Sequence, residues 1–424
     1  MKQSAIKYQL LTLLLFLLAA CRQAEVEYVD FDTFHPTSIK TSPILMDDGS
    51  INPEIQLFDD GNLFADSLTN SQADAPRRIA STTITDMVRD LLSSVNYNNV
   101  LQIAGTYTGH DIDGNPLTQS GKIILPKSGP IHNVIIVSHY TIGANYEAPS
   151  ETFSMEGIFA GKGYAIVLAD YIGYGVTKDR IHPYLHAEST ARSVVDMALA
   201  AIPYLKHIGR APESDEVILL GYSQGGATTL AVLNLIQSKF RKQLPIRRVF
   251  AGAGPYDLTA TYDISMSEDK TGIPCAIPMI VQGISEGEHL NLDMHDFFMP
   301  RLLDNYSSWI NSKQFTVREI NNLIEARQLS LIMTPEGCNK KSKQTARLYK
   351  ALMMNSVLNF KPQAPLYLFH SRNDDTVPFI NSQRAEVAFK GLPVEYNFGN
   401  YGSHMNGFLK FMSAVSSELA NSNN

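Results

Sequence analysis

The sequence predicts an α/β fold in which a mostly parallel central sheet is covered by helices on both faces. Apolar segments of strand length alternate with amphipathic helical segments through residues 134–252, and the alternation returns over residues 365–419. Such alternation is typical of a parallel sheet. Residues 258–360 contain helix-like segments but no strand–helix unit. We therefore expect a helical cap that is inserted between two late strands and lies over the carboxyl ends of the sheet.

The first twenty residues indicate export rather than folded structure. Lys2 and Lys7 precede an apolar segment, Leu10–Ala20, that is too short to span a bilayer comfortably. A short positive region followed by such a segment is typical of a signal peptide, so residues 1–20 are excluded from the fold.

The end of this segment predicts a lipid anchor. The letters LAAC, ending at Cys21, resemble the bacterial lipobox, in which the cysteine is acylated and becomes the new N-terminus. We expect Cys21 to hold the protein at a membrane of the bacterial cell envelope. Arg22, rather than an acidic residue, follows the cysteine and favours the outer membrane. The alternative is an ordinary secretory signal in which Cys21 has no role.

The core is expected on both sides of the cap. Residues 21–80 are polar and are interpreted as a tether with an irregular lead-in, so the core comprises residues 81–257 and 361–424. It opens with a helix and a hairpin, at residues 85–94 and at residues 100–108 and 121–125. Further strands are expected at residues 134–138, 164–169, 217–220, 248–252, 365–370 and 394–398. The main helices are expected at residues 182–205, 381–389 and 407–419.

The composition is that of an ordinary soluble enzyme. The chain has 424 residues, of which 44% are hydrophobic and 18% charged, with 35 basic against 42 acidic side chains. The acidic balance and the absence of a basic run argue against a nucleic-acid partner. Nothing in the composition predicts an oligomeric state.

A sharp turn between a strand and a helix contains the strongest catalytic signal. The apolar run at residues 217–220 breaks at Gly221, Ser223 and Gly225, in the pattern G-x-S-x-G, and continues as a helix-compatible segment. Small residues on both sides let the serine take a strained conformation that exposes its hydroxyl at the edge of the sheet. The pattern alone is weak, but the strand before it and the helix after it favour Ser223 as a nucleophile.

Several segments resemble the α/β-hydrolases that include the fungal secretory lipases and the lipase A-like enzymes. The matching segments are DYIGYG at residues 170–175, HPY at 182–184, GYSQGG at 221–226 and AGPYDL at 253–258. A helical insertion before the last strands is also similar to that group. The resemblance covers residues 97–419 and implies an α/β-hydrolase fold with a helical cap in a serine esterase or lipase.

A nucleophilic serine needs a histidine that accepts its proton and an acid that orients the histidine. In this fold the three residues follow in the order serine, acid, histidine. Of the eleven histidines, only His404 lies beyond the strand that ends at His370. Asp374 and Asp375 both follow that strand, and the resemblance of HSRNDDTVPF to H-G-x-x-D-x-x-V-P selects Asp374, with Asp375 as a solvated neighbour. The alternative is an acidic surface turn and an unrelated loop histidine.

The reaction also requires two hydrogen-bond donors for the oxyanion. One is expected to be the backbone N–H of Gln224, next after the nucleophile. The second is expected from the loop after strand 134–138, at Thr141 or Tyr140. Many related enzymes have His-Gly-x in this loop, and Tyr140 stands in place of the glycine.

No cofactor or metal is expected. One acidic, histidine-containing segment of the cap has the wrong spacing for a zinc or calcium motif and is interpreted as a solvated or hinge-forming face. Its members are Glu286, Glu288, His289, Asp293, His295 and Asp296. Two cysteines, Cys275 and Cys338, fall in the cap and either pair as a disulfide or remain free thiols.

The sequence therefore predicts a serine carboxylic-ester hydrolase, a lipase or esterase that acts on lipid-like or other small esters. Acetyl or aromatic carbohydrate esters remain open as substrates. A serine peptidase is an alternative, because the same triad cuts amides on this fold. A non-catalytic surface lipoprotein that binds ligands is another, although all three triad residues are present.

Overall fold

Nine strands form one sheet in the described part of the chain. The computed structural model describes residues 32–56, 91–92 and 95–421, so the signal peptide, Cys21 and most of the expected helix at residues 85–94 lie outside it. The strand order is β1-β3-β4-β7-β5-β8-β9-β10-β11. The strands are β1 (Phe34–Pro43), β3 (Asn99–His110), β4 (Pro116–Pro126), β5 (Val134–Ser138), β7 (Ala165–Ala169), β8 (Val217–Tyr222), β9 (Ile246–Gly252), β10 (Leu366–Ser371) and β11 (Val394–Gly399).

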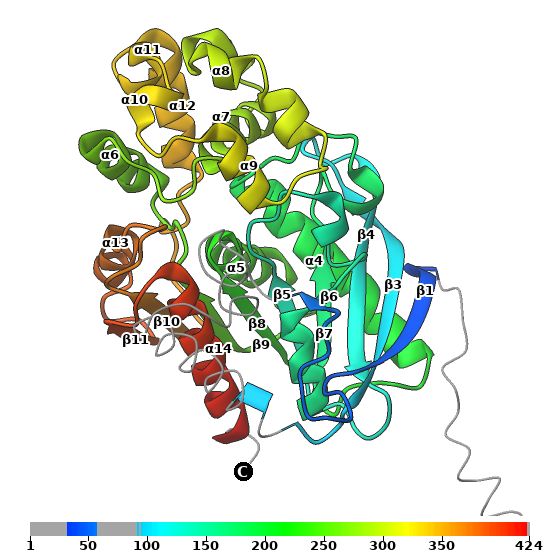
Figure 1. Ribbon diagram of the computed structural model, residues 1–424. Coiled ribbons are helices and arrows are strands. Elements are labelled where there is room, and N and C mark those ends of the chain that lie inside the picture. The colour runs from blue at the N-terminus through cyan, green and yellow to red at the C-terminus, as the bar shows by residue number, and fades with distance from the viewer. Residues whose placement is uncertain (1–31, 57–90, 93–94, 422–424) are drawn as a thin grey trace, which may run out of the picture.

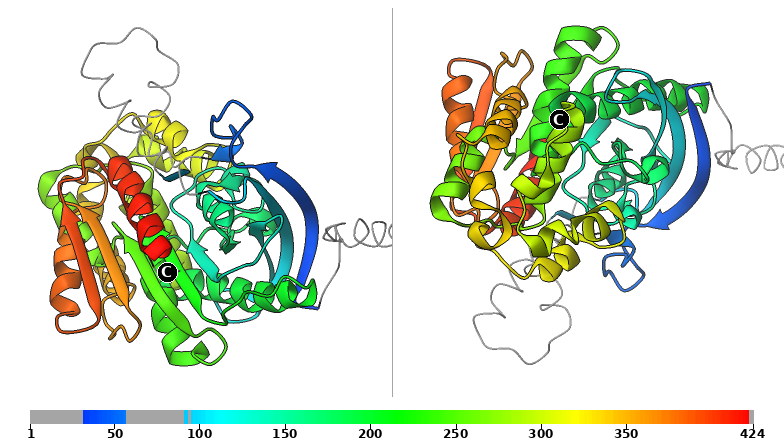
Figure 2. Two further views of the ribbon diagram at one scale, coloured as in Figure 1. Left: turned by 90° about the horizontal axis from the view of Figure 1, so that it is seen from below. Right: turned by 90° about the horizontal axis from the view of Figure 1, so that it is seen from above.

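The sheet is parallel from β7 to β11 and antiparallel on its other side. Strand β7 pairs in parallel with β5, and the parallel pairing continues through β8, β9 and β10 to β11. Strands β1, β3, β4 and β7 pair antiparallel. The two views of Figure 2 place β1 at one lateral edge and β11 at the other. The predicted α/β fold with a mostly parallel sheet is confirmed.

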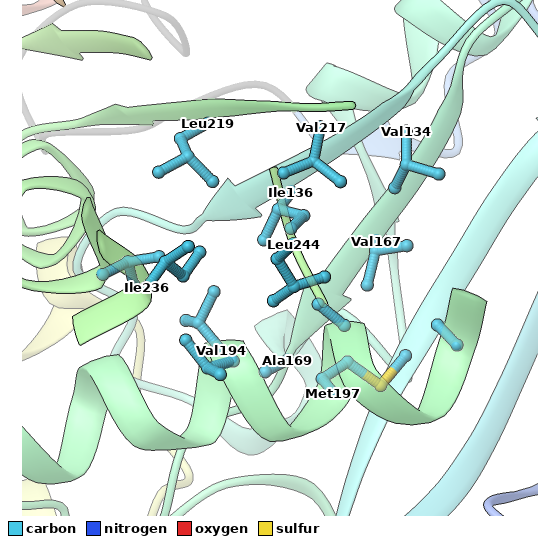
Figure 3. Packing of buried hydrophobic residues seen from close by; sticks show 14 of the residues in the cluster. Val134, Ile136, Val167, Ala169, Val194, Met197, Val217, Leu219, Ile236 and Leu244 are labelled. Atoms are coloured by element: carbon cyan, nitrogen blue, oxygen red, sulfur yellow. The ribbon is translucent and has the colours of Figure 1, made fainter. Parts of the chain in front are cut away.

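Both faces of the sheet are covered, which explains the continuous apolar strands. Helices α4 (Ala187–His207), α5 (Gln224–Leu235) and α13 (Ile380–Ala388) pack on one face. Helix α14 (His404–Asn421) and the 3₁₀ segment Met155–Lys162 pack on the other. Figure 3 shows Val194 and Met197 of α4 directed at side chains of β5, β7 and β8.

One expectation about the N-terminal region is wrong. Residues 34–43 are not an irregular lead-in but strand β1, paired with β3. Only Phe34 and Ile39 are large apolar residues in this segment, and Pro36 and Pro43 weaken a strand prediction. Prolines are tolerated here because β1 is an edge strand, and its register shifts between Pro36 and Ser38. A second, two-stranded sheet joins β2 (Ile55–Gln56) to β6 (Phe153–Ser154).

Seven α-helices lie between β9 and β10, in the region expected to form the cap. They are α6 (Leu258–Glu268), α7 (Ala276–Gly287), α8 (Pro300–Leu303), α9 (Val317–Ile324), α10 (Leu329–Ile332), α11 (Pro335–Cys338) and α12 (Lys343–Met354). Figure 1 shows them gathered at one end of the sheet. They bury a hydrophobic cluster of their own, into which Tyr184 and Leu185 of the core also pack.

Helix α7 attaches this insertion closely to the core. A Cβ atom at Gly283 would stand 2.3 Å from the nitrogen of Tyr184, and one at Gly287 would stand 2.4 Å from the ring of His186. The two glycines are four residues apart and so share one face of the helix. Within the described ranges, no helix combines the length and apolarity needed to cross a bilayer.

Candidate active site

Ser223 stands at the sharp turn between β8 and α5. Its backbone has φ 58° and ψ −128°, a strained conformation for a residue with a side chain. A Cβ atom at Gly225 would stand 2.0 Å from the carbonyl oxygen of Ser138, and one at Gly221 would stand 2.2 Å from that of Gly225. Both glycines are therefore required for this close approach, and the turn geometry expected from G-x-S-x-G is present.

His404 and Asp374 meet at the carboxyl ends of β10 and β11. Asp374 lies in the loop after β10, and His404 is the first residue of α14, after β11. The Nδ1 atom of His404 lies 2.6 Å from Oδ2 of Asp374, and both side chains are fully buried. Because a carboxylate only accepts hydrogen bonds, Nδ1 carries the proton and Nε2 is the nitrogen that can act as a base.

The surroundings of Asp374 favour its ionised form. Its Oδ1 accepts the backbone N–H groups of Thr376 at 2.9 Å and Val377 at 2.8 Å. Its Oδ2 also lies 3.2 Å from Nε2 of His370, a contact that the motif did not reveal. Burial alone would raise the pKa of Asp374, but the contacts with His404 and His370 outweigh it and hold the pKa below its usual range.

The structure distinguishes the two adjacent aspartates. Only Asp374 contacts the ring of His404, as the motif suggested. Asp375 is exposed, but it is more than a solvated neighbour, because its Oδ1 accepts the backbone N–H of His404 at 3.0 Å. This bond joins loops that are 29 residues apart in the sequence, and no local pattern predicts it.

Tyr222 connects the histidine to the serine turn. Its hydroxyl donates to the backbone carbonyl of His404 at 2.8 Å, and the two ring centroids are 4.9 Å apart. Tyr222 immediately precedes Ser223, so His404 packs directly against the turn that carries the serine hydroxyl. Ser223, Gln224 and Asp374 line one cavity of about 500 Å³.

The side chain of Gln224 is held by a buried histidine. Its Nε2 lies 3.1 Å from Nε2 of His182, while Nδ1 of His182 lies 2.7 Å from the carbonyl oxygen of Ile172. Burial lowers the pKa of His182 to about 3, so the ring is neutral. His182 donates to Ile172 and accepts from Gln224, which fixes the residue expected to supply the first oxyanion donor. The motif HPY contained His182 but did not indicate this contact.

The loop after β5 lies against the serine turn, as the close approach of Ser138 and Gly225 shows. In this loop the hydroxyl of Thr141 lies 2.7 Å from that of Tyr184, a residue of the cavity wall. The ring of Tyr140 packs edge-on against Phe408, with centroids 6.1 Å apart.

The family follows from the sequence of this region. A sequence model described as "Secretory lipase" matches residues 149–409, more than half of the chain. The chain belongs to the secretory lipase family. It is accordingly a carboxylic ester hydrolase, as expected, and the predicted resemblance is confirmed. No curated protein matches the sequence.

Solved structures confirm the α/β-hydrolase fold of this secretory lipase family member. It is similar to LipA from Xanthomonas oryzae, described as a rice cell wall degrading esterase, with a TM-score of 0.67 and 23% identity over 80% of this chain and 96% of that one. A Legionella pneumophila protein provisionally assigned as a hydrolase gives a TM-score of 0.68 and 24% identity over 79% of this chain and 94% of that one. Lipase A from Candida antarctica gives a TM-score of 0.56 and 15% identity over 74% of this chain and 75% of that one.

The cavity above Ser223 is bounded mainly by the insertion of this lipase-family chain. Its apolar wall comes from α6, α7, α12 and the loop after β10, and includes Leu258, Ile273, Ala276, Ile277, Ile280, Leu348, Leu352 and Val377. Polar side chains also line it: Glu268, Lys270, Thr271 and Gln383. The insertion therefore shapes the cavity that Ser223 lines.

The two cysteines are free thiols, which contradicts the disulfide alternative. Cys275 is buried at the start of α7, where its N–H donates to Asn321, and burial raises the pKa of its thiol. Cys338 is half-buried at the end of α11, and burial raises its pKa as well.

The side chains of the acidic segment have separate partners. His289 lies 2.9 Å from Asp113 of the β3–β4 turn, and His295 lies 2.8 Å from Asp293. Glu288 accepts from Asn355 at 2.7 Å. The partners of these side chains are different groups, and within the described residues no three His, Cys, Asp or Glu side chains gather as metal ligands.

Proposed function

We propose that Ser223, His404 and Asp374 form a catalytic triad through which the chain hydrolyses carboxylic esters by an acyl-enzyme intermediate. The observation that carries the proposal is the 2.6 Å hydrogen bond between Nδ1 of His404 and Asp374. Tyr222 holds this histidine beside Ser223. The strained backbone of Ser223 and the cavity that it shares with Asp374 support the same assignment.

In the proposed mechanism, Nε2 of His404 accepts the proton of Ser223 as the hydroxyl attacks the ester carbonyl. The ionised Asp374 stabilises the imidazolium, and the backbone N–H of Gln224 donates to the oxyanion. His404 then returns the proton to the leaving alcohol. Water repeats the sequence on the acyl-enzyme.

Of the two candidates for the second oxyanion donor, Thr141 is favoured over Tyr140. The hydroxyl of Thr141 is bonded to Tyr184, which lines the cavity, whereas the ring of Tyr140 packs on Phe408 of α14. Each such donor contributes about 3–4 kcal/mol of transition-state stabilisation.

The proposed substrates are lipid-like esters, because the cavity wall is mainly apolar. Acetyl or aromatic carbohydrate esters are the second candidate. They are favoured by the polar residues that also line the cavity, Glu268, Lys270, Thr271 and Gln383, and by the description of the Xanthomonas oryzae relative as a cell wall degrading esterase.

The test is hydrolysis of p-nitrophenyl esters from acetate to palmitate, beside an acetylated xylo-oligosaccharide and a p-nitroanilide. We expect ester turnover by the wild type and a loss of about 10³-fold or more in kcat for Ser223→Ala and His404→Ala. Equal turnover by Ser223→Ala and the wild type would refute the triad. Preferential cleavage of the anilide would favour a peptidase instead.

We also propose that Cys21 carries the lipid anchor and places the protein in the bacterial cell envelope, with the outer membrane as its site. The support is the LAAC sequence and the secretory character of the family. Wild-type protein made in a bacterial host should enter the detergent phase on phase separation, and Cys21→Ser should not. Detergent partition of both would contradict an anchor at this cysteine.

A further inference from the structure

Asp375 and Asp374 bind the same histidine at different atoms. Asp374 accepts from the ring Nδ1 of His404 at 2.6 Å, and Asp375 accepts from its backbone N–H at 3.0 Å. The carbonyl of His404 accepts from Tyr222 at 2.8 Å. The backbone of His404 is thus held on both sides, once by the acid loop and once by the serine turn.

Helix α14 has a local cap besides the bond from Asp375. The residue before the helix, Ser403, already has a local capping role: its carbonyl accepts the N–H of Gly407 at 2.9 Å, and its hydroxyl lies 3.4 Å from the nitrogen of Asn406. Asp375 adds a carboxylate from a different loop to the first N–H of the helix, where negative charge is favourable. The bond therefore fixes where the helix begins relative to the acid loop.

Other bonds between the two loops lie further from the histidine. Ser371 donates to the carbonyl of Gly402 at 2.6 Å and accepts from the N–H of Tyr401 at 3.1 Å. These bonds hold the loop that precedes His404. Asp374 and Asp375 contact the histidine itself, at its ring Nδ1 and at its backbone N–H.

Gly272 of the insertion packs closely against the backbone of Asp375. A Cβ atom at Gly272 would stand 2.2 Å from the carbonyl oxygen of Asp375 and 2.7 Å from Cα of Thr376. The neighbouring Thr271 donates to the carbonyl of Arg327 at 3.0 Å, which ties this segment to the rest of the insertion. Thr271, Gly272 and Asp375 all line the substrate cavity.

We propose that Asp375 is a positioning residue through which residues 271–273 of the insertion set the place of His404 relative to Ser223. The inference rests on the proposed function of His404 as the general base. A small displacement of a base from its productive geometry lowers the chemical rate more than it weakens substrate binding.

The first test compares Asp375→Ala with Asp375→Asn, which keeps an oxygen acceptor in the same place. With a short p-nitrophenyl ester, we expect Asp375→Ala to lower kcat at least tenfold with KM changed less than twofold. Asp375→Asn should restore most of kcat. The matched control is Asp293→Ala, which removes an exposed carboxylate that also accepts a histidine backbone N–H, at 3.0 Å from His295, and should leave kcat unchanged.

The second test is a double-mutant cycle with Gly272→Ala. If the insertion acts through Asp375, Gly272→Ala should lower kcat in the wild type and have little further effect in Asp375→Ala. A loss of kcat in the double variant equal to the product of the two single losses would overturn the coupling. A wild-type kcat in Asp375→Ala, with Ser223→Ala inactive, would overturn the positioning role and leave the proposed function standing.

Discussion

At the level of single residues, both carboxylate oxygens of Asp374 have hydrogen-bond donors. It accepts from His404, Thr376 and Val377 and contacts His370. Such a buried carboxylate costs little to keep ionised, because its charge is matched by donors fixed by the fold. The motif predicted Asp374 as the acid, but it did not reveal His370, which contacts Asp374 from within strand β10.

Replacing this charge tests the role of Asp374. We expect Asp374→Asn to lower kcat by about 10³–10⁴-fold while the protein remains folded, because the amide holds His404 in the wrong tautomer. The measurement is kcat for a p-nitrophenyl ester beside the circular dichroism spectrum. A loss below tenfold in a folded variant would exclude Asp374 as the orienting acid.

The pH dependence of stability gives a second test of Asp374. Because its pKa is lowered by folding, its contribution is present above the ordinary aspartate pKa, about 4, and is lost as the pH falls towards the folded value. The difference in unfolding free energy between wild type and Asp374→Asn should therefore be constant from pH 5 to 7 and shrink as the pH falls below about 4. Urea titrations at several pH values measure it, and a difference that grows in acid would contradict this sign.

Glu156 should show the opposite sign. Burial raises its pKa from 4.5 to about 7, so the folded state keeps a proton that the unfolded state loses above pH 4.5. Stability from this group is complete below pH 4.5 and falls as the pH rises to 7. We expect Glu156→Gln to be neutral in acid and to stabilise the protein by up to about 3 kcal/mol at pH 8. A variant that is equally stable to the wild type at pH 8 would refute it.

At the level of elements, the sequence predicted correctly the strands that are buried on both faces. Strands β5, β7 and β8 are buried on both faces, so their continuous apolar runs were sufficient to place them. The helix expected from residue 182 begins only at Ala187, because His182 belongs to a loop that reaches the side chain of Gln224. Contacts of this kind depend on distances between segments, which periodicity does not contain.

Strand β1 was missed because only two of its residues are large and apolar, and of these Ile39 is only half-buried. Phe34 is fully buried, and its ring centroid lies 5.0 Å from that of Tyr204 on α4. We expect Phe34→Ala to lower the unfolding free energy by about 3–5 kcal/mol, and Thr37→Ala, at an exposed position of the same strand, by less than about 0.5 kcal/mol. Urea denaturation measures both, and equal small effects would show that β1 adds little to stability.

At the level of the whole molecule, substrate preference depends on how the insertion meets the core. Ala276 at the start of α7 lines the cavity, and a larger side chain there should reduce the space for an acyl chain. We expect Ala276→Phe to lower kcat/KM for palmitate at least tenfold more than for acetate. Ala346→Phe, at an exposed position of α12, is the control. An unchanged ratio would show that long acyl chains bind elsewhere.

Ser223 is proposed as a nucleophile that His404 activates. The most direct measurement is covalent labelling of the folded protein by a fluorophosphonate, with the modified peptide identified by mass spectrometry. We predict one label, on Ser223, that is absent in Ser223→Ala and forms at least a hundredfold more slowly in His404→Ala. A label on another residue, or equal labelling of Ser223→Ala, would exclude Ser223 as the nucleophile.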